Sequence, residues 1–282
     1  MFQLKLENVS GNVVDINDGI QYVVKSVSGL NPPSASIFTS KSPNRKGLRY
    51  NGSTLNERML NIEVKILGDI EANRNALYDW VDPEQYSKIY YRNETKNVYC
   101  EGYVESCEVD LFSDNEIVNV QILCPKPYWN DLQIISTEIS NILKQFTFPF
   151  AIDSAGIPFS TLLEDNKTRI FNGGAETGVQ IYIRGTEDIV NLIIYDVNTA
   201  SRNFKINYTI PAGWVVEIDT EASPKTCKAI KPDGSIVNLM KYLSNPTWFT
   251  LKKGSNQFGF SADSGANSAE ISIRFTNKYL GV

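Results

Sequence analysis

Histidine is absent from the 282 residues of this sequence. Because Ser-His-Asp and Cys-His catalytic units need an imidazole that exchanges a proton near neutral pH, the absence excludes both. It also excludes zinc and non-haem iron sites that use histidine ligands. Gly173 and Gly178 have the spacing of a phosphate-binding loop, but Val179 and Gln180 stand where that loop needs Lys and then Ser or Thr. We therefore predict that the chain is not an enzyme and uses no cofactor or metal.

Long hydrophobic runs are missing as well, because no stretch approaches the roughly 18 apolar residues of a membrane-spanning helix. The first residues lack the basic start and apolar run of a signal peptide, so we expect synthesis in a cytosol. Cysteine is scarce, and no CxxC motif occurs. We favour reduced thiols that pack in the interior, with a disulfide or a four-cysteine metal site as the alternatives. The four residues are Cys100, Cys107, Cys124 and Cys227.

Charge is divided unevenly along the chain, whose 27 basic and 32 acidic residues give a net charge of −5. Residues 1–133 carry 13 basic and 18 acidic side chains, whereas the remainder carries 14 of each. A net negative chain is a poor general nucleic-acid binder, because phosphate binding depends on Lys and Arg. The segment from Val98 to Cys124 holds six acids and no base: Glu101, Glu105, Glu108, Asp110, Asp114 and Glu116. This block predicts either a solvated face or a functional acidic surface.

Strand patterns dominate the first half. Apolar residues alternate with polar ones at Phe2–Glu7, Leu60–Ile66 and Val118–Cys124, as expected for strands with one buried face. The spacing of Ile70, Leu77, Trp80 and Val81 predicts one helix over residues 70–81, capped by Asp69 and ended before Pro83. Residues 98–124 predict a long hairpin around a turn at 113–115.

The second half shows regularly spaced strands and no helical pattern of useful length, which is typical of a β-sandwich. Prolines at 125 and 127 stop sheet pairing before Trp129. We therefore predict two domains, 1–133 and 134–282, and a mainly β fold. The first domain is expected to contain the one helix and the long hairpin.

Residues 31–52 are rich in Pro, Ser and Gly and read as a long loop. Four basic side chains mark it: Lys41, Arg45, Lys46 and Arg49. Two interpretations remain open, a mobile solvated loop or a basic arm that pairs with an acidic surface of a neighbouring copy.

Several segments in a fixed order carry a resemblance. These are Arg58–Ile66 before the helix, Tyr90-Tyr91, and the run from Cys124 to Trp129. Phe148-Pro149-Phe150, Ile170–Gly174, Trp248–Asn256 and the closing Phe275–Val282 follow. Together they resemble the distal tail proteins of bacteriophages with long, non-contractile tails. The resemblance implies an N-terminal β-sandwich-like domain with one helix and a C-terminal galectin-like β-sandwich. It also implies a homo-hexameric ring at the virion tail tip, assembled in the cytoplasm of the bacterial host.

By the same resemblance the ring is a hub of the tail tip, or baseplate. It joins the tail tube protein, the end of the tape-measure protein, the tail-associated lysin or spike and, in many members, receptor-binding proteins. DNA crosses the ring only in transit, and nothing inserts into a membrane. The six acids would then face the channel and the basic segment would dock on the adjacent subunit. The alternative is a carbohydrate-binding module for host adhesion, in which Trp214 would be exposed while Trp248 packs in the core.

Overall fold

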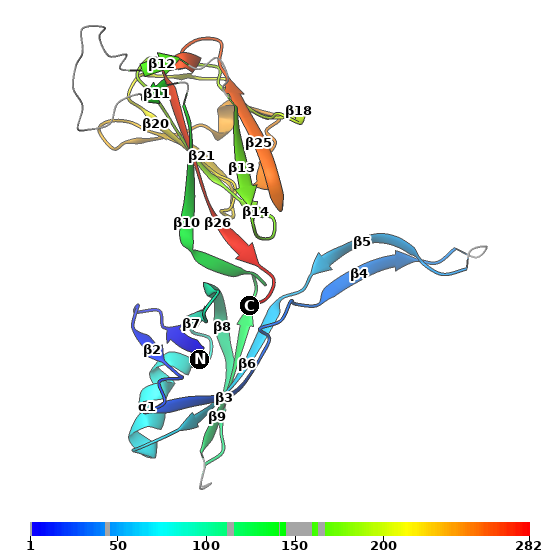
Figure 1. The fold of residues 1–282 in the computed structure, drawn as a ribbon, viewed down its shortest axis with the longest axis vertical. Coiled ribbons are helices and arrows are strands. Elements are labelled where there is room, and N and C mark those ends of the chain that lie inside the picture. The colour runs from blue at the N-terminus through cyan, green and yellow to red at the C-terminus, as the bar shows by residue number, and fades with distance from the viewer. Residues whose placement is uncertain (1, 43–45, 112–115, 141, 145–159, 163–166) are drawn as a thin grey trace. The chain divides into compact units, whose positions relative to one another are not determined.

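The computed structural model describes residues 2–42, 46–111, 116–140, 142–144, 160–162 and 167–282. These residues divide into two compact units. The first comprises Met1–Leu132 together with Lys278–Val282, and the second comprises Gln133–Asn277. Antiparallel strands make up most of both units, and α1 is the one α-helix of the described residues (Figure 1). The mainly β fold with a single helix, predicted from the alternating patterns, is confirmed.

In the first unit, one antiparallel sheet has the strand order β2-β1-β7-β8-β9-β6-β3. The strands β8 and β9 form the predicted hairpin, and their connecting turn lies outside the described residues. A register shift between Val104 and Ser106 bends β8, so that this long strand pairs with β7 along one half and β9 along the other. The strands are β1 (Gln3–Glu7), β2 (Val13–Asp15), β3 (Tyr22–Ser28), β6 (Arg58–Ile66), β7 (Tyr86–Arg92), β8 (Asn97–Val109) and β9 (Ile117–Cys124).

The helix α1 (Ile70–Val81) has the predicted bounds. Its first turn is capped by Asp69, whose side chain accepts a hydrogen bond from the Ala72 N–H at 3.2 Å. Leu77 and Val81 are buried in the core of the first unit. That core also takes the inward residues of the strands, including Leu4, Leu6, Leu60, Ile62, Val64, Ile89, Val98, Val118, Val120, Ile122 and Trp129.

In the second unit, two sheets pack face to face as a β-sandwich. One has the order β26-β15-β20-β21-β22 and the other β13-β25-β17-β18-β23. Alternate residues such as Ile181, Ile183, Phe258 and Phe260 are buried between them. The strands of the first sheet are β15 (Gln180–Gly185), β20 (Val215–Asp219), β21 (Thr226–Ile230), β22 (Ile236–Asn238) and β26 (Ala269–Tyr279). Those of the second are β13 (Lys167–Asn172), β17 (Ile193–Asp196), β18 (Thr199–Ile206), β23 (Leu243–Ser244) and β25 (Gly254–Ser261).

Short elements complete the two units. β10 (Trp129–Ser140) begins in the first unit, where Asn130 pairs with Tyr99 of β8. β4 (Ala35–Ser40) and β5 (Arg49–Leu55) form a separate two-stranded sheet of that unit. The other short pairs are β11 (Ile142–Lys144) with β12 (Ser160–Leu162), β14 (Thr177–Gly178) with β24 (Thr250–Leu251) and β16 (Ile189–Val190) with β19 (Thr209–Ile210), beside the 3-10 turns Met240–Tyr242 and Ala266–Ser268.

A buried amide organises the turn that follows β13. Asn172 is fully buried; its Oδ1 accepts a hydrogen bond from the Gly174 N–H at 2.9 Å. Its Nδ2 donates to the carbonyl oxygens of Ala175 at 2.7 Å and Leu251 at 2.9 Å. The Asn-Gly-Gly turn is therefore held by a side chain that also ties it to β24.

Candidate functional site

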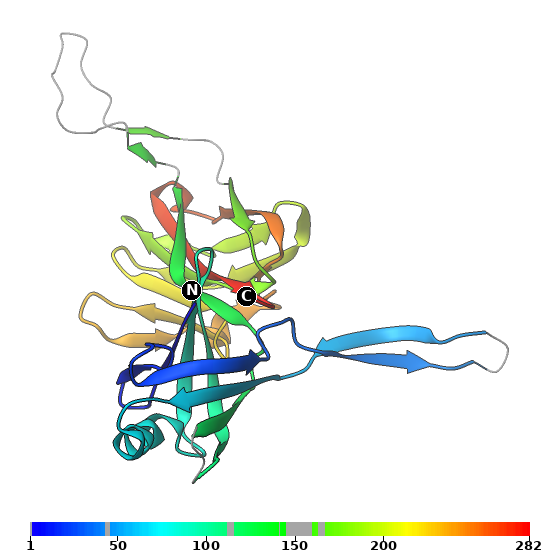
Figure 2. The same ribbon diagram turned by 60° about the horizontal axis from the view of Figure 1, so that its bottom comes forward.

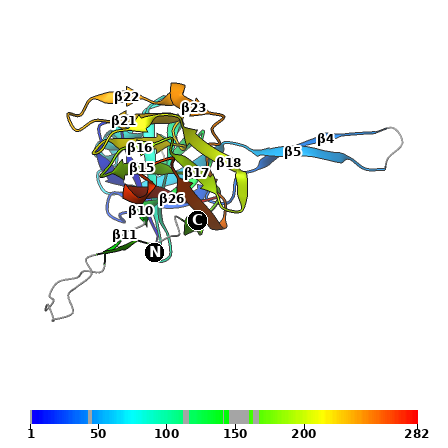
Figure 3. The same ribbon diagram turned by 90° about the horizontal axis from the view of Figure 1, so that it is seen from above.

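The segment predicted as a loop is a hairpin, so that prediction is wrong. Its strands β4 and β5 pair from Ala35↔Leu55 to Ser40↔Arg49, and we call residues 35–55 the arm. Figures 2 and 3 show β4 and β5 reaching away from the sheet of the first unit. Its described basic residues, Lys41, Lys46 and Arg49, are exposed, while Arg45 lies outside the described residues. The structure thus gives the basic segment a regular backbone that can present its side chains.

Large apolar side chains are exposed along the arm. Ile37 is 64% exposed, Phe38 52%, Leu48 65% and Tyr50 63%. A two-stranded hairpin has no core of its own and is marginally stable in isolation. Apolar side chains gathered on such an element are typical of a surface that packs against another protein. The arm therefore carries a stronger interaction signal than its basic residues alone.

Arg58 lies at the root of the arm and is only 2% exposed. Its guanidinium donates hydrogen bonds to the carbonyl oxygens of Gly29, Asn31 (2.8 Å), Pro127 (3.1 and 2.7 Å) and Leu280 (2.6 Å). It also lies 5.4 Å from the ring centroid of Trp129. Burial lowers the pKa of the guanidinium from its ordinary value. We call this set of contacts the Arg58 clamp, because it fastens three distant chain segments.

The last residues of the chain take part in this clamp. The Val282 N–H donates to the carbonyl oxygen of Leu30 at 3.2 Å. Gly281 lies so close to the arm root that a Cβ there would be 2.9 Å from Cδ of Pro32. Lys96 Nζ lies 3.2 Å from the ring centroid of Tyr279. The closing segment thus supports the point from which the arm departs.

The acids of the β8–β9 hairpin do not form one surface. Glu105, Glu108 and Asp110 are exposed, whereas Asp114 lies outside the described residues. Glu116 is only 8% exposed, and its two carboxylate oxygens accept hydrogen bonds from Nη1 of Arg74 at 2.9 and 2.7 Å. Its inclusion in an exposed acidic surface is therefore wrong, because a base on the helix neutralises it. The sequence placed that base 42 residues away.

Glu101 belongs to a different environment, on the outward face of β1, β7 and β8. It lies opposite Lys88, which in turn lies opposite Glu7 on β1. Tyrosines surround this row: Lys88 Nζ lies 4.1 Å from the ring centroid of Tyr99, and Tyr90 donates a hydrogen bond to Glu7. Burial and the neighbouring carboxylates raise the pKa of Tyr90 above its ordinary value. Glu101 thus has a base directly opposite it on the neighbouring strand, which sequence order did not reveal.

The cysteines lie in packed environments, and all four thiols are free. Cys100 and Cys124 are fully buried with their Sγ atoms 3.8 Å apart. Burial raises the pKa of Cys107 to about 11 and that of Cys227 to about 12. The thiols of Cys107 and Cys227 therefore stay protonated near neutral pH and are poor nucleophiles.

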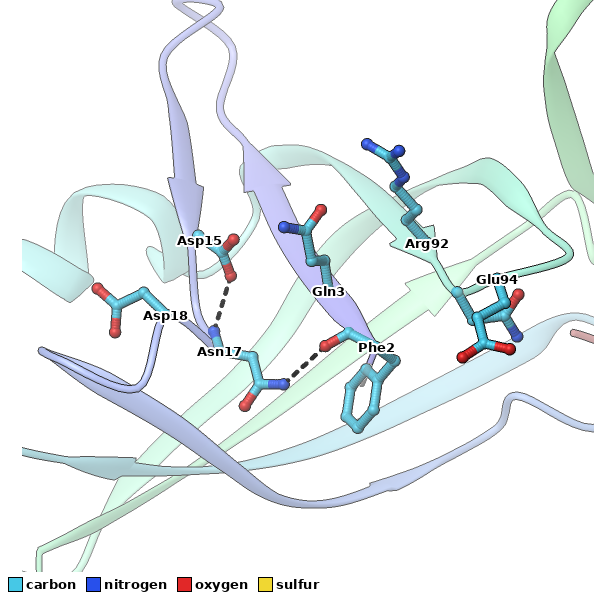
Figure 4. Close-up of a pocket in the computed structure, with 8 residues that line it drawn as sticks. Phe2, Gln3, Asp15, Asn17, Asp18, Arg92 and Glu94 are labelled. Atoms are coloured by element: carbon cyan, nitrogen blue, oxygen red, sulfur yellow. Dashed lines mark hydrogen bonds between the residues drawn. The ribbon is translucent and has the colours of Figure 1, made fainter.

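A depression of about 600 Å³ in the first unit is lined by Phe2, Gln3, Asp15, Asn17, Asp18, Arg92, Asn93 and Glu94 (Figure 4). Its polar groups are engaged with the backbone. Asn17 donates from Nδ2 to the Phe2 carbonyl oxygen at 3.0 Å, and Asp15 accepts from the Asn17 N–H at 3.0 Å. Asp18 accepts from three backbone N–H groups, of Ile20, Gln21 and Tyr22. Asp15 and Asp18 hold the backbone of the loop before β3, and this structural role accounts for both carboxylates without a binding or catalytic site.

Within the ranges that the structure covers, no group of three or more Cys, Asp or Glu side chains is placed to hold a metal ion. Over those ranges no helix is long and apolar enough to cross a bilayer.

The two tryptophans of the second unit, Trp214 and Trp248, are both half-buried. Trp248 packs edge-on against Phe204 with ring centroids 5.1 Å apart, as predicted for a core residue. Trp214 packs against the core of the second unit, and Lys231 Nζ lies 5.3 Å from its ring centroid. The expected exposure of Trp214 is therefore wrong.

Comparison with known proteins gives consistent results for both units. Residues 9–124 match the family described as a phage tail protein RIFT-related domain. Residues 172–279 match the C-terminal domain of the siphovirus-type tail component. No protein of curated function matches the sequence.

Two solved structures share the fold. One is the Dit protein (gp 19.1) of phage SPP1, described as a paradigm of the hub adsorption apparatus in phages that infect Gram-positive bacteria. The comparison with it gives a TM-score of 0.69 at 14% sequence identity and covers 99% of both chains. The other is a chain of the phage P2 baseplate in its activated conformation with Ca, with a TM-score of 0.51 at 13% identity over all of both chains. The fold and the two matched domains, in this order, agree with the segments that carried the resemblance. The chain belongs to the distal tail proteins of siphoviruses, the phages with long, non-contractile tails.

Proposed function

We propose that this chain is the structural hub of a phage tail tip and closes into a homo-hexameric ring. The ring joins the tail tube to the tail-associated lysin or spike, meets the end of the tape-measure protein, carries receptor-binding proteins and lets DNA pass through its channel. Its work is non-enzymatic. It is synthesised and assembled in the host cytoplasm and then resides at the virion tail tip.

The observation that supports a ring most directly is the arm. It presents Ile37, Phe38 and Tyr50 to solvent together with the basic residues Lys41, Lys46 and Arg49. The first unit carries 14 basic and 18 acidic side chains, a net charge of −4, so the basic tip of an arm would meet a net negative unit on another copy. The apolar side chains supply the burial that isolated surface ion pairs do not, since such pairs contribute about 0–1 kcal/mol each.

The ring is tested by the mass of the purified protein in solution and by negative-stain images. We expect a particle of six times the 31.6 kDa of one chain, with a central hole. Replacing Ile37, Phe38 and Tyr50 by Ser is expected to give monomers. Ile20→Ser is the matched control, because Ile20 is 77% exposed in the same unit but away from the arm. A monomeric wild-type chain at every concentration, or intact rings in the triple variant, would contradict the proposal.

The channel surface that we propose contains fewer residues than the six acids of the sequence pattern. It comprises the exposed Glu105, Glu108 and Asp110, to which Asp114 is added from the sequence alone. Like charges would keep the DNA phosphates from adhering as they pass. Changing Glu105 and Glu108 to Lys is expected to slow DNA delivery by assembled particles. Glu187→Lys with Glu270→Lys, an equal change of charge at exposed positions of the second unit, is expected to leave delivery unchanged.

A further inference from the structure

The outward face of the sheet β13-β25-β17-β18-β23 differs in charge from the rest of the chain. Buried residues such as Ile170, Phe258 and Phe204 alternate along these strands with residues that point away from the core. The outward positions include Lys167, Arg169 and Lys205. On these strands as described, no outward position carries an acidic side chain. The face is therefore positive, although the second unit as a whole carries 13 basic and 14 acidic side chains and has a net charge of −1.

A flat aromatic ring lies on this face. A Cβ built on Gly259 of β25 would fall 2.6 Å from Cζ and 2.7 Å from the hydroxyl oxygen of Tyr195, its neighbour on β17. The ring therefore lies across the backbone of Gly259, which only glycine allows. With one face on the sheet and the side chain half-buried, the other face of the ring points outward. Such a ring accepts the C–H face of a pyranose and does not need a deep pocket.

A fixed guanidinium lies on the opposite side of β25. Arg169 of β13 lies opposite Gln257 of β25. In the amide orientation that satisfies both side chains, the Gln257 oxygen accepts hydrogen bonds from Arg169 Nη2 at 2.8 Å and Nε at 3.1 Å. This contact holds the plane of the guanidinium against the sheet. A planar guanidinium is the side chain that matches carboxylate and phosphate groups best.

Ring and guanidinium are separated by a distance that suits a sugar chain. Tyr195 of β17 lies opposite Gly259 of β25, and Arg169 of β13 lies opposite Gln257 of β25. Tyr195 and Arg169 are therefore two strands apart across the sheet and two residues apart along it. With strand spacings near 4.8 Å and a rise near 3.3 Å per residue, their Cα atoms are on the order of 12 Å apart. That distance spans two to three sugar rings. Exposed Phe171, at 70%, extends the face beyond Arg169 on the same strand.

From this arrangement we propose that the outward face of the second unit binds an anionic polysaccharide, with one pyranose on Tyr195 and separate carboxylate or phosphodiester groups at Arg169 on one side of it and at Lys205 on the other. Nucleic acid fits less well. Its binding rests on many phosphate contacts and on several stacking rings, whereas this face offers three bases and one flat ring in a chain of net charge −5. The proposal does not depend on the hexameric ring of the proposed function, because every residue that carries it belongs to the second unit.

The test uses the full chain and three probes in isothermal titration calorimetry at fixed salt: polygalacturonate, neutral dextran and oligodeoxythymidylate. A sugar 1-phosphate polymer, poly(N-acetylglucosamine 1-phosphate), separates phosphodiester from carboxylate recognition. We expect one of the two anionic polysaccharides to bind at least tenfold more tightly than dextran and than oligodeoxythymidylate. Tyr195→Leu and Arg169→Gln should each weaken that binding at least fivefold, while Tyr195→Phe, which keeps the ring, should stay within twofold.

The matched control is Lys231→Gln, which removes one positive charge from the turn between β21 and β22 of the other sheet. It should leave binding unchanged. The proposal is overturned if neither anionic polysaccharide binds, if Lys231→Gln weakens binding as much as Arg169→Gln, or if oligodeoxythymidylate binds most tightly. It is also overturned if Arg169→Gln lowers the mass of the protein in sedimentation, because the face would then be a contact between copies.

Discussion

Arg58 Nη2 donates a hydrogen bond to the carbonyl oxygen of Leu280 at 2.6 Å, across 222 residues of sequence. The same side chain reaches Asn31 at the arm root and Pro127 before β10. The acceptors of its hydrogen bonds are backbone carbonyl oxygens, so the dipoles of three segments solvate a buried cation. A docked arm needs a fixed root, and this side chain provides it.

Arg58→Lys is expected to destabilise the first unit by about 2–4 kcal/mol, because an ammonium cannot span three segments and leaves buried carbonyl groups unpaired. Amide hydrogen exchange in β6 and β9 reports the change for this unit. Arg92→Lys serves as control, since Arg92 is exposed and a surface change there should stay within about 0.5 kcal/mol. Equal protection in both variants would mean that the clamp does not stabilise the unit.

Gly29, beside the clamp, has a backbone conformation that only glycine adopts easily. Its φ is +89°, and a Cβ there would lie 2.0 Å from the carbonyl oxygen of Met59. Gly29→Ala is expected to cost more than about 3 kcal/mol, because it adds a clash with β6 to the left-handed strain. Gly19→Ala isolates the strain: φ is +73° with no atom within 4 Å, and the expected cost is about 1 kcal/mol. Similar losses, measured by urea denaturation, would show that the contact with Met59 is unimportant.

Asn172→Asp tests the buried turn after β13 with almost no change of volume. The substitution places a carboxylate oxygen against the carbonyl oxygens of Ala175 and Leu251, in place of an N–H donor to each. We expect the second unit to lose about 3–5 kcal/mol at pH 7. Acidification should restore part of this loss, because the protonated acid can donate once. Asn198→Asp, at an exposed position, should have little effect at either pH.

Elements with one buried face could be predicted from sequence. The helix α1 follows from the cap at Asp69 and the stripe that includes Leu77 and Val81, and β8 and β9 follow from strict alternation. The arm could not, because Ile37 and Phe38 are adjacent and both exposed. Periodicity reports which side of a strand faces a core, and a two-stranded hairpin without a core leaves no such pattern.

The candidate sites were harder to predict for a related reason. Arg58 has acceptors 27 to 222 residues away, and they are backbone carbonyl groups that any residue supplies. Glu116 looked unbalanced because Arg74, its partner, lies on the helix rather than in the hairpin. Net charge counted along a segment ignores partners brought in by the fold, so a block of acids predicts an acidic surface only after those contacts are known.

Cys227 of β21 provides a test of burial in the second unit that depends on pH. It is 1% exposed, and burial raises the pKa of its thiol to about 12, whereas a thiol in an unfolded chain titrates near pH 8.5. Above that pH the unfolded chain loses a proton that the folded chain keeps, so stability falls by about 1.4 kcal/mol per pH unit until the folded pKa is reached. Between pH 9 and 11, the wild type should therefore lose about 2–3 kcal/mol more than Cys227→Ala. The comparison uses hydrogen exchange of β21 or urea denaturation across this range. Parallel pH profiles for the two proteins would show that the thiol ionises as readily in the folded state, which contradicts its burial between the two sheets.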